Sequence, residues 1–446
     1  MSEYLKEAQW IADLTVEKLS DENSLLPKRI DCQSGEVMDP ERMIDDLGDY
    51  VQNIWYLGKI LGNQGFMDFA VTSVCNAARS YQDESGLFKG AFRQGILGKI
   101  DWYSNEDVFV GLTALYRLSK NRQIEDIIIR FQQGIERYAC DSGVLPAAER
   151  GILKYIGIPP KAFVEGLVQS YLANGSKNTL DLAKRLTAPW INLQFFKRHG
   201  IFPSRILTLS RLNDKMQRHI NFLGKCIIPK TNVNFLHGIL ELYKVTGDKI
   251  YADSMRQWIN SAEKNLVKDG LYVFSYNANN GTWSHHNKAI VPLIAVLAFY
   301  ADFYKHIGDA EVLSILKRWA DNVLQSQTEA GFFRDAPHDP KDSKYSRGFL
   351  DCQTDMSVLL LKLHGLTNNA GYLEAAKRCI DGVIKHLKRP YGYIEYFNPV
   401  NGSAEHHSRM YTKFFTLFIK ALILLDAALS GEDIYQEELF ILTADR

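Results

Sequence analysis

The sequence has no excess of charge of either sign and no long uninterrupted apolar run. Lysine plus arginine and aspartate plus glutamate each number 52, so the formal net charge is zero. No overall field therefore draws the protein to nucleic acid or to a membrane surface. The longest apolar candidate, from Phe414 to Leu429, is interrupted by Lys420 and Asp426. We therefore expect neither a nucleic-acid nor a membrane partner.

Cysteine is scarce, and the motifs that would give it a role are absent. The six cysteines show no CxxC spacing, and no HExxH motif occurs. This pattern favours free thiols in a reducing compartment and predicts no metal site and no cofactor. The start, Met1 to Lys6, is polar and lacks the apolar core of a signal peptide. We expect a soluble, cytoplasmic protein.

A glycine followed by large apolar residues recurs along the whole chain. The spacings between successive glycines are 57, 57, 70, 61 and 61 residues, for Gly86, Gly143, Gly200, Gly270, Gly331 and Gly392. Each glycine follows an amphipathic stretch and precedes a long loop and then a more apolar stretch. A hairpin of two helices cannot bury its own apolar face, so a repeat of this length predicts stacked helical hairpins.

Two sets of helices are expected between the turns. The amphipathic set covers about 4–20, 66–82, 123–139, 177–197, 249–267, 310–327 and 371–387, and belongs on the outside. The apolar set covers about 44–61, 105–119, 161–173, 231–245, 286–306, 351–366 and 408–429, and belongs inside. The predicted fold is all-α, an α/α toroid of six to seven helical hairpins with short β-hairpins at its mouth, forming a single domain over residues 1–446.

The long loops all lead into the apolar helices, and this places the candidate site at their N-termini. Capping would explain Asp45, Asn105 and Asp351, which stand just before their apolar stretches. It does not explain Asp49, Asp107 and Asp355, which lie further inside and are the predicted catalytic carboxylates. Predicted substrate-binding residues, drawn from the aromatic, acidic and cationic side chains nearby, are Asp46, Trp102, Tyr103, Glu106, Arg150, Trp283, His286, Arg347, Asp351, His406 and Arg409.

A second internal repeat links two segments 121 residues apart. Residues 277–286 align without gaps to residues 398–407, and both contain Asn-Gly and end in His-His. Asn-Gly between β-prone runs predicts two β-hairpins over the mouth. Each His pair either packs its hairpin against the helices or sends one imidazole into the pocket, and the sequence leaves both possibilities open.

Two sets of residues resemble metal-binding patterns. The His pairs with Asp351 and Cys352 could converge on adjacent helices, but no zinc-type spacing supports a site. The segment 45–49 fits the DDxxD pattern that binds magnesium and diphosphate in terpene synthases, but no second motif of that kind follows. Both readings are disfavoured.

With its repeat, its loop asymmetry and its mouth rich in aspartate and aromatic residues, the chain resembles the six-hairpin glycosidase superfamily and its seven-hairpin relatives. Segments 46–49 and 349–355 are similar to the catalytic aspartate segments of unsaturated glucuronyl and rhamnogalacturonyl hydrolases, although the His-Asp dipeptide frequent there is missing. The resemblance implies an α/α toroid that acts on glycans.

The expected function is hydrolysis of a short oligosaccharide, including one that contains uronate, by carboxylate general acid and base catalysis. A polysaccharide lyase or a sugar epimerase would use the same architecture with His or Tyr as the base. A toroid that binds a peptide or protein without catalysis is the third possibility.

Overall fold

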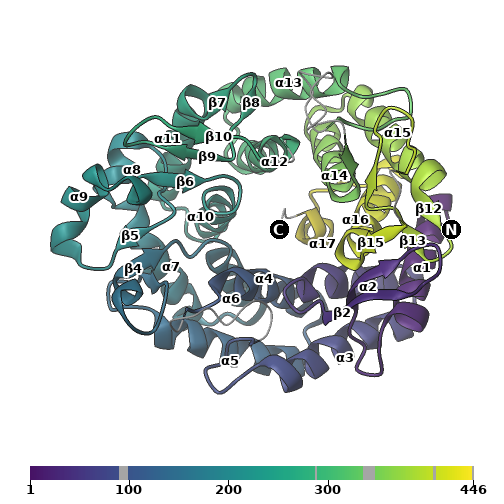
Figure 1. The fold of residues 1–446 in the computed structure, drawn as a ribbon, viewed down its shortest axis with the longest axis horizontal. Helices are drawn as coiled ribbons and strands as arrows, with labels where there is room; N and C mark the ends of the chain where they lie inside the picture. The colour runs from purple at the N-terminus through teal and green to yellow at the C-terminus, as the bar shows by residue number, and fades with distance from the viewer. Residues whose placement is uncertain (90–98, 287–288, 335–346, 405–407, 444–446) are drawn as a thin grey trace. The chain divides into compact units, whose positions relative to one another are not determined.

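The computed structural model describes residues 1–89, 99–286, 289–334, 347–404 and 408–443. The chain is 62% helical, with 17 α-helices among these residues. All fourteen helices expected from the sequence are present (Figure 1). The all-α prediction is therefore confirmed. The single domain expected over 1–446 stays a prediction.

The apolar set consists of α2 (Leu47–Leu61), α4 (Trp102–Ser119), α6 (Phe163–Asn174), α10 (Val233–Thr246), α12 (Ile290–Ile307), α14 (Leu350–Thr367) and α16 (Thr412–Leu429). The amphipathic set consists of α1 (Glu3–Leu14), α3 (Gln64–Tyr81), α5 (Arg122–Tyr138), α7 (Lys177–Ile191), α11 (Lys249–Asn265), α13 (Ala310–Gln325) and α15 (Ala370–Leu387). Three short helices were not expected separately: α8 (Gln194–His199), α9 (Ser210–His219) and α17 (Glu437–Thr443).

The backbone divides into two compact units, residues 1–76 with 287–445 (unit 1) and residues 77–286 (unit 2). In unit 1 the apolar helices pack in the order α12, α14, α16 and α2, and α16 also packs against α1. The first and the last long helices of the chain therefore lie side by side. In unit 2 the order is α4, α6 and α10. Within the units, α4, α6, α10, α12 and α14 each also pack against the amphipathic helix that follows them.

The repeated glycines sit where a loop meets the backbone of a helix. Gly86 has φ of +87°, and a Cβ there would lie 2.0 Å from the carbonyl oxygen of Arg130 in α5. Gly331 has φ of +92°, and its Cβ would lie 2.3 Å from the carbonyl oxygen of Arg378 in α15. Any side chain would clash with backbone, and positive φ already disfavours residues other than glycine. This contact explains the glycine that marks the repeat.

The two sets of helices start differently. Asn or Asp side chains from the short turns cap α5, α11, α13 and α15, namely Asn121, Asp248, Asp309 and Asn369. In the apolar set, among described residues, a capping side chain is found at α4 alone, where Asp101 accepts from the backbone N–H of Ser104. Asp45, Asn105 and Asp351 are therefore not caps, and the capping prediction was wrong. Asn105 instead bonds the backbone of Phe88 through both its amide atoms.

The strands are short and lie in the long loops. They are β1 (Pro27–Asp31), β2 (Val37–Arg42), β3 (Leu145–Pro146), β4 (Ile156–Ile158), β5 (Ile206–Leu207), β6 (Lys225–Ile227), β7 (Val267–Lys268), β8 (Leu271–Tyr272), β9 (Ser275–Asn277), β10 (Trp283–Ser284), β11 (Gly348–Phe349), β12 (Lys388–Arg389), β13 (Gly392–Tyr393), β14 (Tyr396–Phe397) and β15 (Arg409–Tyr411). They pair in sheets of two or three strands, among them β15-β1-β2 and β10-β9-β6.

The internal repeat of 121 residues is visible in the backbone. The β7–β8 pair corresponds to the β12–β13 pair, and β9 corresponds to β14. In the first copy Asn277 donates its N–H to Thr282, and in the second Asn398 donates its N–H to Ser403. Gly281 and Gly402 both have φ of +71°. The predicted hairpins are present, with a longer turn than the two-residue Asn-Gly turn expected.

One helix of the described residues, α12, is long and apolar enough to cross a membrane by length and composition, with a mean hydropathy of 1.4. The expectation that no such segment exists was therefore wrong for this helix. Within the structure 72% of it is buried, as in the core helix of a soluble protein.

Candidate functional site

Three carboxylates are buried where α2 begins. Asp45, Asp46 and Asp49 are 6%, 4% and 7% exposed, respectively. None of the three side chains caps α2, because among the described residues no side chain forms a capping hydrogen bond at the start of this helix. Burial raises the pKa of Asp45 well above its usual range, and the neighbouring charge of Asp46 adds to this effect. A carboxyl that keeps its proton near neutral pH can act as a general acid.

Residues from β15 and the start of α16 hold these acids. The hydroxyl of Tyr411 donates to Asp46 Oδ2 at 2.6 Å. Lys413 Nζ lies 2.5 Å from Asp46 Oδ1 and 3.1 Å from Asp49 Oδ2. One cation therefore serves two buried carboxylates, with the third beside them. Tyr411 and Lys413 were not among the predicted site residues; their place at the start of the apolar helix α16 was the available signal.

Asp355, a predicted catalytic residue, lies on α14, which packs against α16. Its Oδ1 is 3.3 Å from Nζ of Lys420 in α16, and the two side chains are 30% and 6% exposed. Lys413 and Lys420 are seven residues apart on α16, which places them on one face of the helix. Because α16 packs between α2 and α14, this face supplies cations to both neighbouring acids. Asp355 therefore contacts another apolar helix.

Arg409 opens β15 and lies against a buried acid. Its Nε is 3.4 Å from Oε2 of Glu395, which is 2% exposed, and its guanidinium carbon lies 5.9 Å from the centroid of the Tyr396 ring. Glu395 was missed as a candidate; a lone acid in an aromatic strand, Tyr393 to Phe397, was its signal. Of the other unit 1 candidates, Arg347 is exposed and Asp351 half-buried in the first turn of α14.

Unit 2 has a buried acid of its own at the start of α4. Glu106 is 1% exposed, and Lys161 Nζ donates to its Oε1 at 2.9 Å. Burial raises the pKa of Glu106 to about 7, against the opposing charge of Lys161. Asp107 follows it as a half-buried residue of the same helix, and Arg150 is exposed in the loop after β3.

The two aromatic candidates beside this acid differ. Tyr103 is 37% exposed, with the ammonium groups of Lys161 and Lys230 at 4.8 and 3.6 Å from its ring centroid. Trp102 is 2% exposed, and its indole N–H donates to the carbonyl of Pro146 at 2.7 Å. Its rings pack in the core, so Trp102 offers no face to a ligand. The substrate-binding role expected for it is not supported by its burial.

The first β-hairpin presents an exposed tryptophan. Trp283 is 41% exposed, and its ring centroid lies 5.1 Å from that of His285 in an edge-on arrangement. His286 is half-buried with its ring 4.6 Å from Phe274. His406, the corresponding candidate of the second hairpin, lies outside the described residues.

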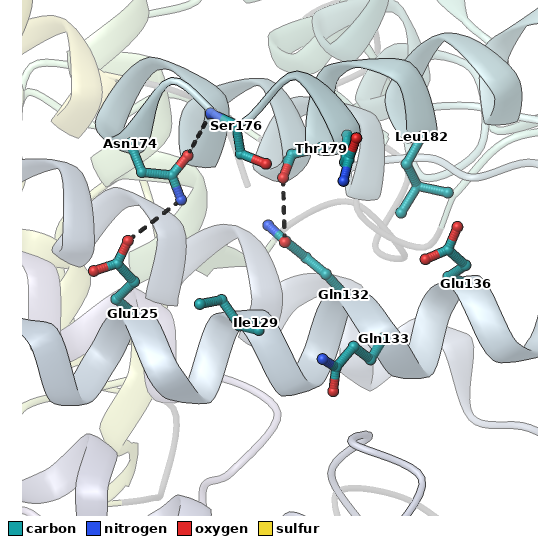
Figure 2. A pocket seen from close by; sticks show the side chains of 10 residues that line it. Glu125, Ile129, Gln132, Gln133, Glu136, Asn174, Ser176, Thr179 and Leu182 are labelled. Carbon is teal, nitrogen blue, oxygen red and sulfur yellow. Dashed lines mark hydrogen bonds between the residues drawn. The ribbon is translucent and has the colours of Figure 1, made fainter.

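Two cavities lie in unit 2, and none of the predicted site residues is among the residues that line them. One of about 450 Å³ runs between α5 and α7 and is lined by polar side chains that bond one another, among them Asn174 to Glu125 and Thr179 to Gln132 (Figure 2). The other, of about 640 Å³, is lined by Tyr138, Glu149, Lys154 and Tyr155 among others. Across the described part of the chain, no group of three or more His, Cys, Asp or Glu residues could hold a metal ion.

Comparison with solved structures shows the fold. An alpha-1,2-mannosidase from Trichoderma reesei matches with a TM-score of 0.60 at 12% identity, covering 93% of this chain and 92% of its own. A D-mannose isomerase matches with a TM-score of 0.58 at 11% identity, covering 96% and 98%. An unsaturated glucuronyl hydrolase from Bacillus sp. GL1 matches with a TM-score of 0.57 at 12% identity, covering 97% and 99%.

The chain therefore shares its fold, an all-α arrangement of helical hairpins, with these solved structures. The match is structural, because no protein-family model and no curated protein sequence matches this chain. The fold expected from the glycine repeat is confirmed. At identities of 11% to 12%, the neighbours establish the fold, and the chemistry must be argued from the residues of this chain.

Proposed function

We propose that this protein is a carbohydrate-active enzyme that hydrolyses a short oligosaccharide by general acid and base catalysis. The observation that carries the proposal is the group of three buried carboxylates at the start of α2, contacted by Lys413 and Tyr411. Burying acids costs several kcal/mol unless they are compensated, so such a group is retained for function more readily than for stability.

The group offers two carboxyls for the two roles that glycosidic bond cleavage requires. Asp45, whose pKa is raised by burial and by Asp46, carries the proton that a leaving oxygen needs. We assign to Asp49, which is ion-paired to Lys413, the role of the carboxylate that activates water, and the ion pair supports this assignment. Asp107 and Asp355, on α4 and α14, remain the further catalytic candidates.

The structural neighbours support the substrate class. A mannosidase, a D-mannose isomerase and a glucuronyl hydrolase all act on sugars, and each spans nearly the whole of this chain. We further propose that the reaction is hydrolysis and that the substrate is a short oligosaccharide, one option being an oligosaccharide that contains uronate. We also propose that the protein acts in the cytoplasm.

Isomerisation or epimerisation of a sugar is the second candidate function, with lyase chemistry as its variant. It is favoured by the D-mannose isomerase neighbour and by Tyr411, whose hydroxyl contacts the acid group. If the protein instead binds a partner without catalysis, it should turn over no glycan.

The test is incubation with short neutral and uronate-containing glycans, followed by mass spectrometry and NMR. Gain of water marks a hydrolase, elimination marks a lyase, and an unchanged mass with a new NMR spectrum marks an epimerase or isomerase. Asp49→Asn should abolish the reaction. Asp253→Asn, which changes an exposed aspartate of α11, is the matched control and should leave it intact. No turnover of any glycan by the wild type would overturn the proposal.

A further inference from the structure

Three neighbouring helices of unit 2 bring one tyrosine and two lysines together at their N-termini. The helices α4, α6 and α10 pack in sequence. Tyr103 lies in the first turn of α4, Lys161 two residues before α6, and Lys230 three residues before α10. The N-termini of helices carry partial positive charge, so the three helix ends add to the field of the two lysines.

Lys161 is held in one position. Its backbone has φ of +41°, a conformation that residues other than glycine rarely adopt and that costs free energy. Its ammonium group donates to Glu106, which is 1% exposed, and 12% of the Lys161 side chain is exposed. The ion pair with the buried Glu106 therefore fixes the direction of the Lys161 side chain. The backbone strain at Lys161 is a cost of this position.

The ring of Tyr103 lies close to both cations. Both ammonium groups lie within 5 Å of its centroid, at 4.8 Å for Lys161 and 3.6 Å for Lys230. Two ammonium groups around one ring repel each other, and a shared anion relieves this repulsion. Tyr103 is 37% exposed and Lys230 is exposed, so a ligand can reach the pair.

We propose that Lys161 and Lys230, which both lie close to Tyr103, bind the anionic group of an acidic sugar, either a carboxylate or a phosphate ester. This inference rests on the proposed function, and it names the substrate class and the residues that recognise it. The anion would accept hydrogen bonds from both ammonium groups while Glu106 keeps Lys161 in place.

The test is isothermal titration of the whole protein with D-glucuronate, D-glucose 6-phosphate, D-glucose, acetate and inorganic phosphate. We expect at least one acidic sugar to bind, with the affinity falling as salt is added, and glucose to bind at least about tenfold more weakly. Which acidic sugar binds distinguishes a carboxylate from a phosphate ester. Binding of acetate or inorganic phosphate as tightly as the matching sugar would overturn the assignment to a sugar.

Lys161→Met and Lys230→Met should each weaken binding of the acidic sugar by about tenfold or more and leave glucose unchanged. Lys230→Met leaves both Lys161 and Glu106 in place, so it tests the site even if Lys161→Met fails to fold. Lys154→Met is the matched control, because Lys154 lies 4.8 Å above the ring of Tyr155 and no second lysine of the described residues is found over that ring. An equal loss in the control overturns the proposal. Turnover of neutral glycans without acidic-sugar binding overturns this inference alone, whereas acidic-sugar binding without any turnover overturns the proposed function.

Discussion

Unit 1 and unit 2 both bury acids where an apolar helix begins, but they balance the charge differently. In unit 1, Asp46 and Asp49 share Lys413, and Asp45 stands beside them. In unit 2, Glu106 has Lys161 to itself. The pKa of Asp45 is raised by burial and by a neighbouring carboxylate, whereas that of Glu106 is raised by burial against an opposing cation.

This difference in the ratio of acids to cations explains how a proton donor arises. When buried acids outnumber the cations beside them, one acid can keep its proton. The three carboxylates of unit 1 lie near two ammonium groups, those of Lys413 and Lys28, so they cannot all be compensated as ions, and the raised pKa of Asp45 favours its protonated form. Where one carboxylate faces one ammonium group, the pair can serve to position the cation. In our proposal the acid group of unit 1 transfers a proton and the Glu106–Lys161 pair of unit 2 positions a cation for binding, while Asp107 of unit 2 remains a separate catalytic candidate.

The largest expected effect concerns turnover and tests one predicted catalytic carboxylate in each unit. Asp49→Asn in unit 1 and Asp107→Asn in unit 2 should each reduce turnover by at least about 10²–10⁴-fold, because the amide cannot transfer a proton. Melting temperatures should change little, since the amide keeps the volume of the acid. Kinetic assays beside thermal melts of both variants check this. If both retained near-normal activity, the chemistry would have to be assigned to Asp355, Glu106 or the His pairs.

The next effect concerns stability and should be alike in the two units. Gly86→Ala in unit 2 and Gly331→Ala in unit 1 each force a side chain to positive φ and against a helix carbonyl. The expected loss is about 2–5 kcal/mol for each, from the strained backbone and the overpacking together. Urea unfolding measures it. Gly175→Ala, at positive φ but in open space, is the control and should lose only the backbone part.

The sequence predicted the helices well because each one is specified locally. A period of 3.6 residues, a glycine and an Asn or Asp turn together define each repeat, as at Gly86 and Asn121. The site was predicted less well because the direction of a side chain depends on tertiary contacts. Trp102 beside an acid looks like a sugar platform in sequence, yet its N–H points to the Pro146 carbonyl. Lys161 and Lys413 were not among the predicted site residues, because their partners are 55 and 367 residues away in the sequence.

The contribution of Glu106, the buried acid of unit 2, to the stability of the protein should depend on pH. The pKa of Glu106 is about 7 in the folded state, above its ordinary value of 4.5, so the folded protein binds more protons between these values. Its contribution to stability is therefore present below pH 4.5 and is lost as the pH rises towards 7, with a slope of at most about 1.4 kcal/mol per pH unit. Glu106→Gln should remove this slope, which urea unfolding at pH 5, 6 and 7 would show. A variant with the same pH dependence as the wild type would contradict the assignment.

The smallest expected effect compares the two copies of the repeated hairpin. The first copy has Trp283 where the second has Ala404, although the backbones correspond. If the hairpin forms part of the site, Trp283→Ala should weaken glycan binding by about 1–3 kcal/mol and leave the melting temperature nearly unchanged. Its exposure of 41% favours this outcome over a packing role. If the ring instead pins the hairpin through His285, the melting temperature should fall while the affinity stays the same. Because the second copy folds into the same turn with alanine at this position, the fold does not require tryptophan here, and a ligand is the better reason for an aromatic side chain in one copy alone.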